Sequence, residues 1–248
     1  MTNQVANLSD QQSDASPGTE RAPGWAVLHL FCDVAADTET GAVQSALTTC
    51  RADSYEVVTA EIIGHKADLG VLALGPSFER LRQLQTELRQ AGCTPKYSYV
   101  SLTEVSEYAK HVPDAAKKAR LRPKIPPAKM PAFCFYPMSR RRDGDKNWYR
   151  LSYEERLRMM VSHGKVGSIF RGRVLQLVTG SSGLDDWEWG VTLFAATFDD
   201  IKSCVYAMRY DEASARYAEF GPFVAGMVKS PAEILAALRP TGRSPVTR

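Results

Sequence analysis

The side chains best suited to holding a metal ion or moving a proton in this sequence are its four histidines, His29, His65, His111 and His163. His29 lies in an apolar run that predicts a strand, so a buried or barrel-facing imidazole is favoured there over a metal ligand. His65 lies in the turn Gly64–Lys66 and is expected to be solvated. His111 has no evident partner, which leaves His163 as the candidate of most interest.

His163 ends a predicted helix, Glu154–Ser162, and directly precedes Gly164, which suits a left-handed C-terminal cap. A histidine at that position gains from the helix dipole without any functional role. Apolar Met159, Met160 and Val166 flank it, so the imidazole could instead point into a hydrophobic cavity. An imidazole that reaches from a helix into such a cavity is a common way of holding a haem iron.

A second segment with chemical potential is Phe133–Arg142, which combines Tyr136, a proline and three consecutive arginines. A tyrosine at the end of a strand usually packs and hydrogen-bonds at the rim of a sheet. Beside a redox cofactor, Tyr136 could instead donate an electron or a hydrogen atom. Composition by itself does not decide between these two roles.

Positive charge is concentrated in Lys117–Lys129, which holds six basic residues and no acidic one. A solvated face is one explanation, and the wall of a pocket for an anionic small molecule is the other. The whole chain carries a net charge of +3, with a pI near 8.6, which is too mild to predict a nucleic-acid partner.

Other kinds of site find little support. The five cysteines are scattered without CxxC spacing, so neither a zinc site nor a disulfide framework is expected, and a reducing cytoplasm is the natural compartment. Asp185 and Asp186 fit a turn better than a metal site. Gly180–Gly183 lacks the lysine and the spacing of a phosphate-binding loop. No spacing typical of nucleophilic catalysis occurs.

The elements that must position these residues follow alternating periodicities. The first half predicts the order β-α-β-β-α-β of a ferredoxin-like unit, with Ser77 as a helix cap. Its predicted segments are 25–32, 41–50, 55–63, 68–74, 77–90 and 96–105.

The second half repeats this order, with a capping box formed by Ser152 and Glu155. Its predicted segments are 132–136, 152–163, 172–179, 187–194, 198–208 and 220–227. Leu69–Leu81 aligns with Trp189–Ile201 at a constant offset of 120 positions, and Gly70 matches Gly190. We therefore expect an α+β fold of two tandem ferredoxin-like (βαββαβ) modules, whose sheets pack face to face or close into one dimeric α/β-barrel-type subunit.

The predicted organisation has five parts. They are a disordered polar tail (1–23), an N-terminal module (24–108), a basic proline-containing linker (109–131), a C-terminal module (132–240) and a short tail (241–248). Uncharged stretches such as Gly70–Phe78 are too short to span a bilayer, and no secretory signal is expected.

With these residues in place, the sequence resembles the coproheme decarboxylases of the chlorite-dismutase-like superfamily, from about Trp25 to Met227. The resemblance is carried by six ordered blocks: Phe135–Arg142, Asn147–Tyr149, Arg158–Gly164, Leu175–Ser181, Gly183–Val191 and Met208–Gly221. The duplicated ferredoxin-like fold is also the fold of that family.

The resemblance implies a cytoplasmic homopentamer that binds iron coproporphyrin III (coproheme) in the C-terminal module. With hydrogen peroxide, such enzymes convert two propionates to vinyls and release haem b and two CO2. It implies His163 as the iron ligand and Tyr136 as the radical-forming catalytic residue. The implied porphyrin-binding residues are Arg122, Tyr136, Pro137, Met138, Ser139, Arg140, Gln176 and Ser214. Transient contact with the preceding enzyme of the haem pathway is a further implied partner.

Three positions depart from relatives of that family. Arg140 stands where lysine is common, Ser168 where arginine is common, and Ala132 where some members carry a histidine nearby. Two alternatives remain beside the decarboxylase. One is a non-catalytic haem-binding or haem-handling protein on the same fold, and the other is a chlorite-decomposing enzyme. Chlorite decomposition resembles a chemistry that uses a distal arginine, and this chain has Gln176 at that position.

Overall fold

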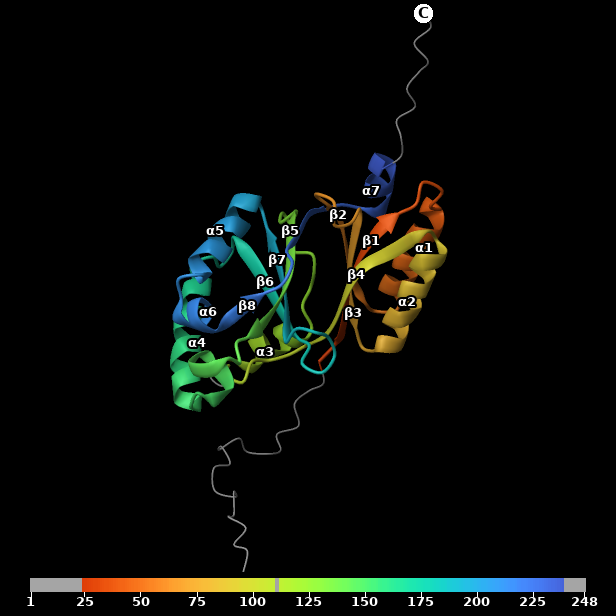
Figure 1. Cartoon of the computed structure of the whole chain (residues 1–248). Coiled ribbons are helices and arrows are strands. Elements are labelled where there is room, and N and C mark those ends of the chain that lie inside the picture. The colour runs from red at the N-terminus through yellow and green to blue at the C-terminus, as the bar shows by residue number, and fades with distance from the viewer. Residues whose placement is uncertain (1–23, 110–111, 239–248) are drawn as a thin grey trace, which may run out of the picture.

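The computed structural model describes residues 24–109 and 112–238. The predicted tails 1–23 and 241–248, together with His111, lie outside these residues. None of the described helices is long and apolar enough to cross a membrane. Two lobes make up the described chain, each with helices on the outside and strands toward the centre (Figure 1).

The N-terminal lobe is the predicted ferredoxin-like unit. Its strands lie in the order β4-β1-β3-β2 and pair antiparallel throughout. Helices α1 and α2 cover the outer face of this sheet (Figure 1). The elements are β1 (Ala26–Val34), α1 (Thr40–Ala52), β2 (Glu56–Ile62), β3 (Leu69–Gly75), α2 (Phe78–Gln90) and β4 (Cys93–Thr103).

The C-terminal lobe repeats the arrangement, with strand order β6-β7-β5-β9. A short helix and strand, α6 and β8, are inserted before its last strand. The elements are β5 (Ala132–Arg140), α4 (Tyr153–Ser168), β6 (Val174–Gly180), β7 (Trp189–Ala195), α5 (Phe198–Met208), α6 (Glu212–Tyr217), β8 (Ala218–Phe220) and β9 (Val224–Val228). Two single 3₁₀ turns, Gly144–Lys146 and Trp148–Arg150, precede α4.

The internal repeat is confirmed at the level of single residues. The bounds of β3 and β7 are 120 positions apart at both ends, and α2 and α5 also begin 120 positions apart. Ser77 caps α2 by accepting from the backbone N–H of Arg80, and Thr197 caps α5 by accepting from that of Asp200. The same strand, cap and helix were therefore specified twice.

The two sheets join edge to edge rather than stacking as separate layers. β4 pairs with β6 through Leu102 and Thr103, and β2 pairs with β9 through Ala60–Ile62. Because β5 also pairs with β7, eight of the nine described strands form a closed ring, and β8 lies outside it. Of the two expected arrangements, the structure adopts the single barrel.

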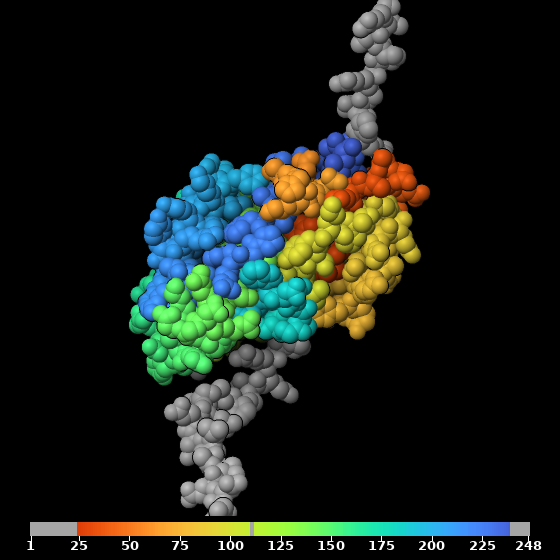
Figure 2. Space-filling view, in the orientation of Figure 1, coloured from red at the N-terminus to blue at the C-terminus, as the bar shows by residue number. Residues whose placement is uncertain are grey.

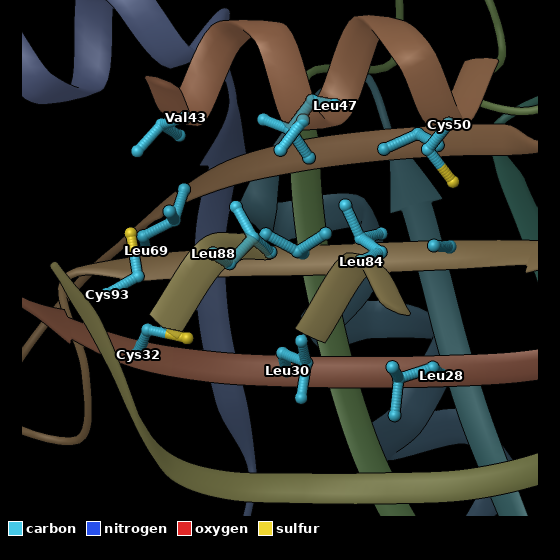
Figure 3. Close-up of a cluster of buried hydrophobic side chains, with 14 of the residues drawn as sticks. Leu28, Leu30, Cys32, Val43, Leu47, Cys50, Leu69, Leu84, Leu88 and Cys93 are labelled. Carbon is cyan, nitrogen blue, oxygen red and sulfur yellow. The ribbon is translucent and has the colours of Figure 1, made fainter. Parts of the chain in front are cut away.

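Two layers of apolar side chains hold each lobe. Between α1, α2 and the N-terminal sheet lies a core that includes Leu30, Leu47 and Leu84, all at most 1% exposed (Figure 3). Burying a leucine in this way contributes about 1.5–3 kcal/mol. Inside the barrel, a second core that includes Phe31, Phe133 and Phe194 joins the two lobes.

Besides the inserted α6 and β8, other elements differ from the sequence prediction. Helix α4 does not stop before Gly164 but continues to Ser168, so the predicted left-handed cap at Gly164 is wrong. Strand β5 extends beyond Tyr136 to Arg140, and the linker contains a helix, α3 (Asp114–Leu121). Tertiary packing overrides the local glycine signal, because the neighbouring helices stabilise the longer α4.

The last described helix, α7 (Pro231–Leu238), lies against the N-terminal lobe. Ile234 and Leu235 belong to the core beneath α1, although the predicted C-terminal module 132–240 contains them. Figure 2 shows the blue C-terminal segments running across to the red and orange lobe. The end of the chain thus ties the two halves together.

Candidate functional site

The site is built around His163, which α4 presents one turn before its end. Ser152 and Glu155 form the predicted capping box, which fixes where this helix begins. His163 Nδ1 lies 2.7 Å from Asp211 Oδ2, and the imidazole side chain is 27% exposed. A carboxylate can only accept, so Nδ1–H donates to it and Nε2 is the ring nitrogen left to face a metal ion. This is how proteins commonly prepare a histidine to ligate a metal.

Asp211 is itself rigidly held. Its side chain is fully buried and caps α6 by accepting from the backbone N–H groups of Ala213 and Ser214. Burial alone raises the pKa of Asp211, but the hydrogen bonds from His163 and Ser214 outweigh it, so the net pKa lies below its ordinary value. The carboxylate therefore remains charged beside the imidazole.

Tyr136 lies on the outer face of β5, beneath the helices of the C-terminal lobe. Its ring stacks on Phe223 with the ring centroids 4.4 Å apart, and Phe220 packs at 5.8 Å. Burial raises the pKa of Tyr136 well above its usual range, although nearby Arg209 opposes this slightly. Its hydroxyl forms no hydrogen bond with any described residue. The phenol is therefore protonated at neutral pH.

A cleft of about 670 Å³ is lined by neighbours of both residues, although neither residue lines it directly. Ser214 lines it and is 3.5 Å from His163 Nδ1, while Phe223 lines it and stacks on Tyr136. The cleft is lined by Arg141, Arg209, Ser214, Ala215, Ala218, Glu219, Phe220 and Phe223. Arg209 over two phenylalanine rings, with Arg141 also in the lining, suits a flat ligand that carries carboxylates.

Arg209 is a site residue that sequence reasoning missed. Its guanidinium lies 4.1 Å from the Phe220 ring centroid and 6.0 Å from that of Phe223. It follows α5 as the C-terminal capping residue, where a cation is ordinary, so its type and position gave no signal. Only the return of the chain through β8 and β9 places the two phenylalanines beneath it.

The segment that follows Tyr136 divides between two faces because β5 continues through it. Successive side chains of a strand point to opposite faces of the sheet, and β5 pairs regularly here, with Pro137 opposite Gly190 and Met138 opposite Trp189. Met138 packs with Tyr136 on the helix-covered face, while Ser139 accepts from the backbone N–H of Glu188. The five consecutive residues predicted to bind one ligand therefore do not all face one side.

Gln176 and Arg122 occupy different places. Gln176 is exposed on β6, and its amide donates to Cys204 Sγ at 3.6 Å, close to Gly167 of α4. It thus shares the face of α4 that carries His163. Arg122 is exposed at the end of α3, with its guanidinium 5.9 Å from the Trp25 ring. No described contact joins Arg122 to the cleft.

The remaining candidates have structural roles. His29 is fully buried inside the barrel and His65 is exposed, as predicted. All five cysteines are buried and free. Asp185 accepts from the backbone N–H of Val100 in a turn, and the described residues contain no cluster of acidic, cysteine and histidine side chains that could hold a metal.

Comparison with known proteins agrees with this geometry. The family model described as chlorite dismutase matches residues 36–229. The chain belongs to the chlorite dismutase family. This match covers most of both modules, including the cleft.

Solved structures extend the comparison. A heme-binding protein from Thermus thermophilus is 34% identical, with a TM-score of 0.80 over 87% of this chain and 95% of that one. A variant chlorite dismutase from Candidatus Nitrospira defluvii is 17% identical (TM-score 0.68), covering 88% of this chain and 96% of that one. The putative chlorite dismutase TA0507 is 17% identical (TM-score 0.69), covering 88% and 100%. The last two support the fold alone.

Proposed function

We propose that this protein binds iron coproporphyrin III and, with hydrogen peroxide, decarboxylates two of its propionates to give haem b. The observation that carries the proposal is the His163–Asp211 pair beside a cleft lined by arginines and phenylalanines. The relative described as heme-binding, at 34% identity, supports a porphyrin as the ligand class.

The residues present fit an iron porphyrin. His163 Nδ1–H donates a hydrogen bond to Asp211, so Nε2 is the ring nitrogen that would hold the iron. The cleft of about 670 Å³ lies within the usual range for small-molecule pockets.

The charged arms of such a ligand also find partners. Arg209 and Arg141 line the cleft with Ser214, and guanidiniums bind carboxylates through short, often bidentate pairs. Arg141 Nε lies 3.9 Å from Glu219, so this arginine is held by a loose ion pair that a ligand carboxylate could replace. These side chains suit a porphyrin that carries carboxylates.

Tyr136 is the residue proposed to carry the chemistry. When bound, the iron porphyrin supplies the oxidising power for the reaction with peroxide. Tyr136 gives up its phenolic hydrogen and then takes a hydrogen atom from the propionate carbon next to the ring. Each propionate loses that hydrogen and CO2 with two electrons, which reduce one peroxide to water. The apolar packing of Tyr136 against Phe220 and Phe223 excludes water from the phenol.

Assembly and the remaining roles belong to the same proposal. A homopentamer is proposed, with Gln176 on the distal side of the ring. A haem-handling protein without turnover is the second candidate, which the name of the Thermus thermophilus relative favours. Chlorite decomposition is the third, favoured by the description of the matching family.

Titration with coproheme, followed by peroxide and mass spectrometry of the porphyrin, separates these functions. The proposal predicts two successive losses of CO2 and accumulation of haem b. Tight binding with bleaching alone would assign a haem-handling role and contradict the decarboxylase. Oxygen release from chlorite, measured with an oxygen electrode, would favour the third candidate.

A further inference from the structure

Arg140 differs from an anion-binding arginine because its guanidinium is already engaged. The residue is only 6% exposed, and its guanidinium carbon lies 4.4 Å from the Trp148 ring centroid. Nη1 donates to the carbonyl oxygen of Ala213 at 2.7 Å, and Nη2 contacts the sulfur of Met160 at 3.2 Å. Both terminal nitrogens therefore have partners, and a carboxylate arm of a ligand would have to displace them.

The contact with Ala213 connects Arg140 to the iron-binding histidine. Ala213 lies in the first turn of α6, immediately after Glu212 and Asp211. The backbone N–H of Ala213 donates to Asp211 Oδ1, and Asp211 Oδ2 accepts from His163. The peptide groups of Ala213 are thus fixed from two sides, by Arg140 at the carbonyl and by Asp211 at the N–H.

The surroundings make this connection rigid. Trp148, Met159, Ala213 and Tyr217 form one buried cluster between α4 and α6, and the Trp148 ring packs edge-on to Tyr217 at 5.4 Å. The backbone N–H of Arg140 donates to Glu188 Oε2 at 2.7 Å, which anchors the other end of the residue. A flat guanidinium can stack on an indole and donate in its own plane at the same time, whereas an ammonium cannot.

We propose that Arg140 is a positioning residue that holds the start of α6, so that the Asp211 carboxylate stays aligned on His163. It acts through Ala213 and Asp211 and does not bind the ligand carboxylates. Its effect on iron rests on the function proposed above, because it needs His163 as the axial ligand. Its effect on α6 needs no ligand at all.

Two variants and one control test the proposal. Arg140→Met keeps the apolar stem and removes the donors, and Arg140→Lys keeps the charge and removes the planar fork. Arg142→Met removes an exposed arginine two residues along the chain and serves as the control. Hydrogen exchange in the protein without porphyrin should be about tenfold faster at the Ala213 and Ser214 amides in Arg140→Met. It should be unchanged in Arg142→Met.

The second readout is the iron–histidine stretching frequency of the ferrous porphyrin complex. A carboxylate aligned on Nδ1 strengthens the imidazole as a donor, so misalignment in Arg140→Met should lower the frequency and raise the reduction potential. If Arg140 acted only through its charge, its removal would strengthen the Asp211 hydrogen bond and raise the frequency, which would overturn the proposal. Arg140→Lys should shift in the same direction as Arg140→Met, by less.

The outcomes separate this inference from the proposed function. A wild-type complex without a histidine-bound iron signal would remove the function while leaving the hydrogen-exchange result to decide the role of Arg140. A normal wild-type signal, with Arg140→Met unchanged in both readouts, would overturn the positioning role alone. Porphyrin affinity that falls sharply in Arg140→Met, with unchanged exchange and frequency, would return Arg140 to direct carboxylate binding.

Discussion

His29 Nε2 lies 2.8 Å from Thr192 Oγ1, and this hydrogen bond joins the first strand of one lobe to the middle of the other. The imidazole is fully buried and packs 4.2 Å from the Phe135 ring, while its Nδ1 has no hydrogen-bond partner. Burial lowers the pKa of His29 to about 3. A neutral imidazole is therefore part of the contact between the lobes.

Acid should destabilise the protein through this residue. The folded-state pKa lies below the unfolded value of 6.5, so the unfolded chain binds the extra proton as pH falls. The contribution of His29 alone should then lower the free energy of unfolding by about 1.4 kcal/mol for each pH unit below about 6. Urea unfolding at pH 7 and pH 5 measures this slope.

Variants of two histidines assign the slope. His29→Gln cannot titrate and should flatten the dependence between pH 7 and pH 5, at a cost in stability at pH 7. His65→Gln changes an exposed histidine and should leave the slope as in the wild type. Equal slopes for His29→Gln and the wild type would show that other groups cause the acid sensitivity.

Replacing the proposed iron ligand should abolish the histidine-bound spectrum. His163→Ala removes the imidazole whose Nδ1 is bonded to Asp211, so coproheme should bind more weakly and lose its five-coordinate spectrum. Absorption spectra during a coproheme titration measure both effects, with His65→Ala as the control. An unchanged spectrum in His163→Ala would assign the iron ligand to another residue.

Removing one oxygen should separate binding from chemistry. Tyr136→Phe keeps the stacking on Phe223 but lacks the phenolic hydrogen, so coproheme should bind normally and stall before the first loss of CO2. The loss in rate should be at least about 100-fold, the size typical of removing a reacting group. Mass spectrometry of the porphyrin after peroxide measures it, and normal haem b formation would exclude Tyr136 from the mechanism.

Two glycines should respond to alanine in opposite ways. Gly164 lies within α4 with open space around its Cβ position, so Gly164→Ala should raise the stability of the porphyrin-free protein by about 0.5–1 kcal/mol. A Cβ on Gly190 would lie 2.6 Å from the Tyr99 ring, and Gly190→Ala should cost about 1–3 kcal/mol. Urea unfolding compares them. Destabilisation by Gly164→Ala would instead indicate a left-handed cap.

The two arginines outside β5 should differ in their effect on ligand carboxylates. Arg209 lines the cleft, whereas Arg122 lies over Trp25. Arg209→Gln should weaken coproporphyrin binding about tenfold, as expected for one charge-assisted contact, and Arg122→Gln should weaken it less. Fluorescence titration with metal-free coproporphyrin measures both. A larger effect of Arg122→Gln would place a carboxylate at the linker.

Local sequence signals predicted the repeated unit, and they drew attention to two candidate site residues. The caps at Ser77 and Ser152 act through their own helices, so they could be predicted without tertiary contacts. The apolar alternation of the strands and the offset of 120 positions predicted two ferredoxin-like modules, and the structure has them. His163 and Tyr136 were candidates by residue type and position, and only the resemblance to a known family gave them expected roles.

Only the tertiary structure decided how these pieces meet. Closure of the barrel depends on pairings such as Ile62 with Gly226, which no local pattern encodes. Sequence reasoning assigned no role to Asp211 and only an implied ligand-binding role to Arg140, yet folding buries both beside α4. The reason is physical: burial and a partner distant in sequence determine what a charged side chain does, and the chain supplies both only once β5, α4 and α6 are packed together.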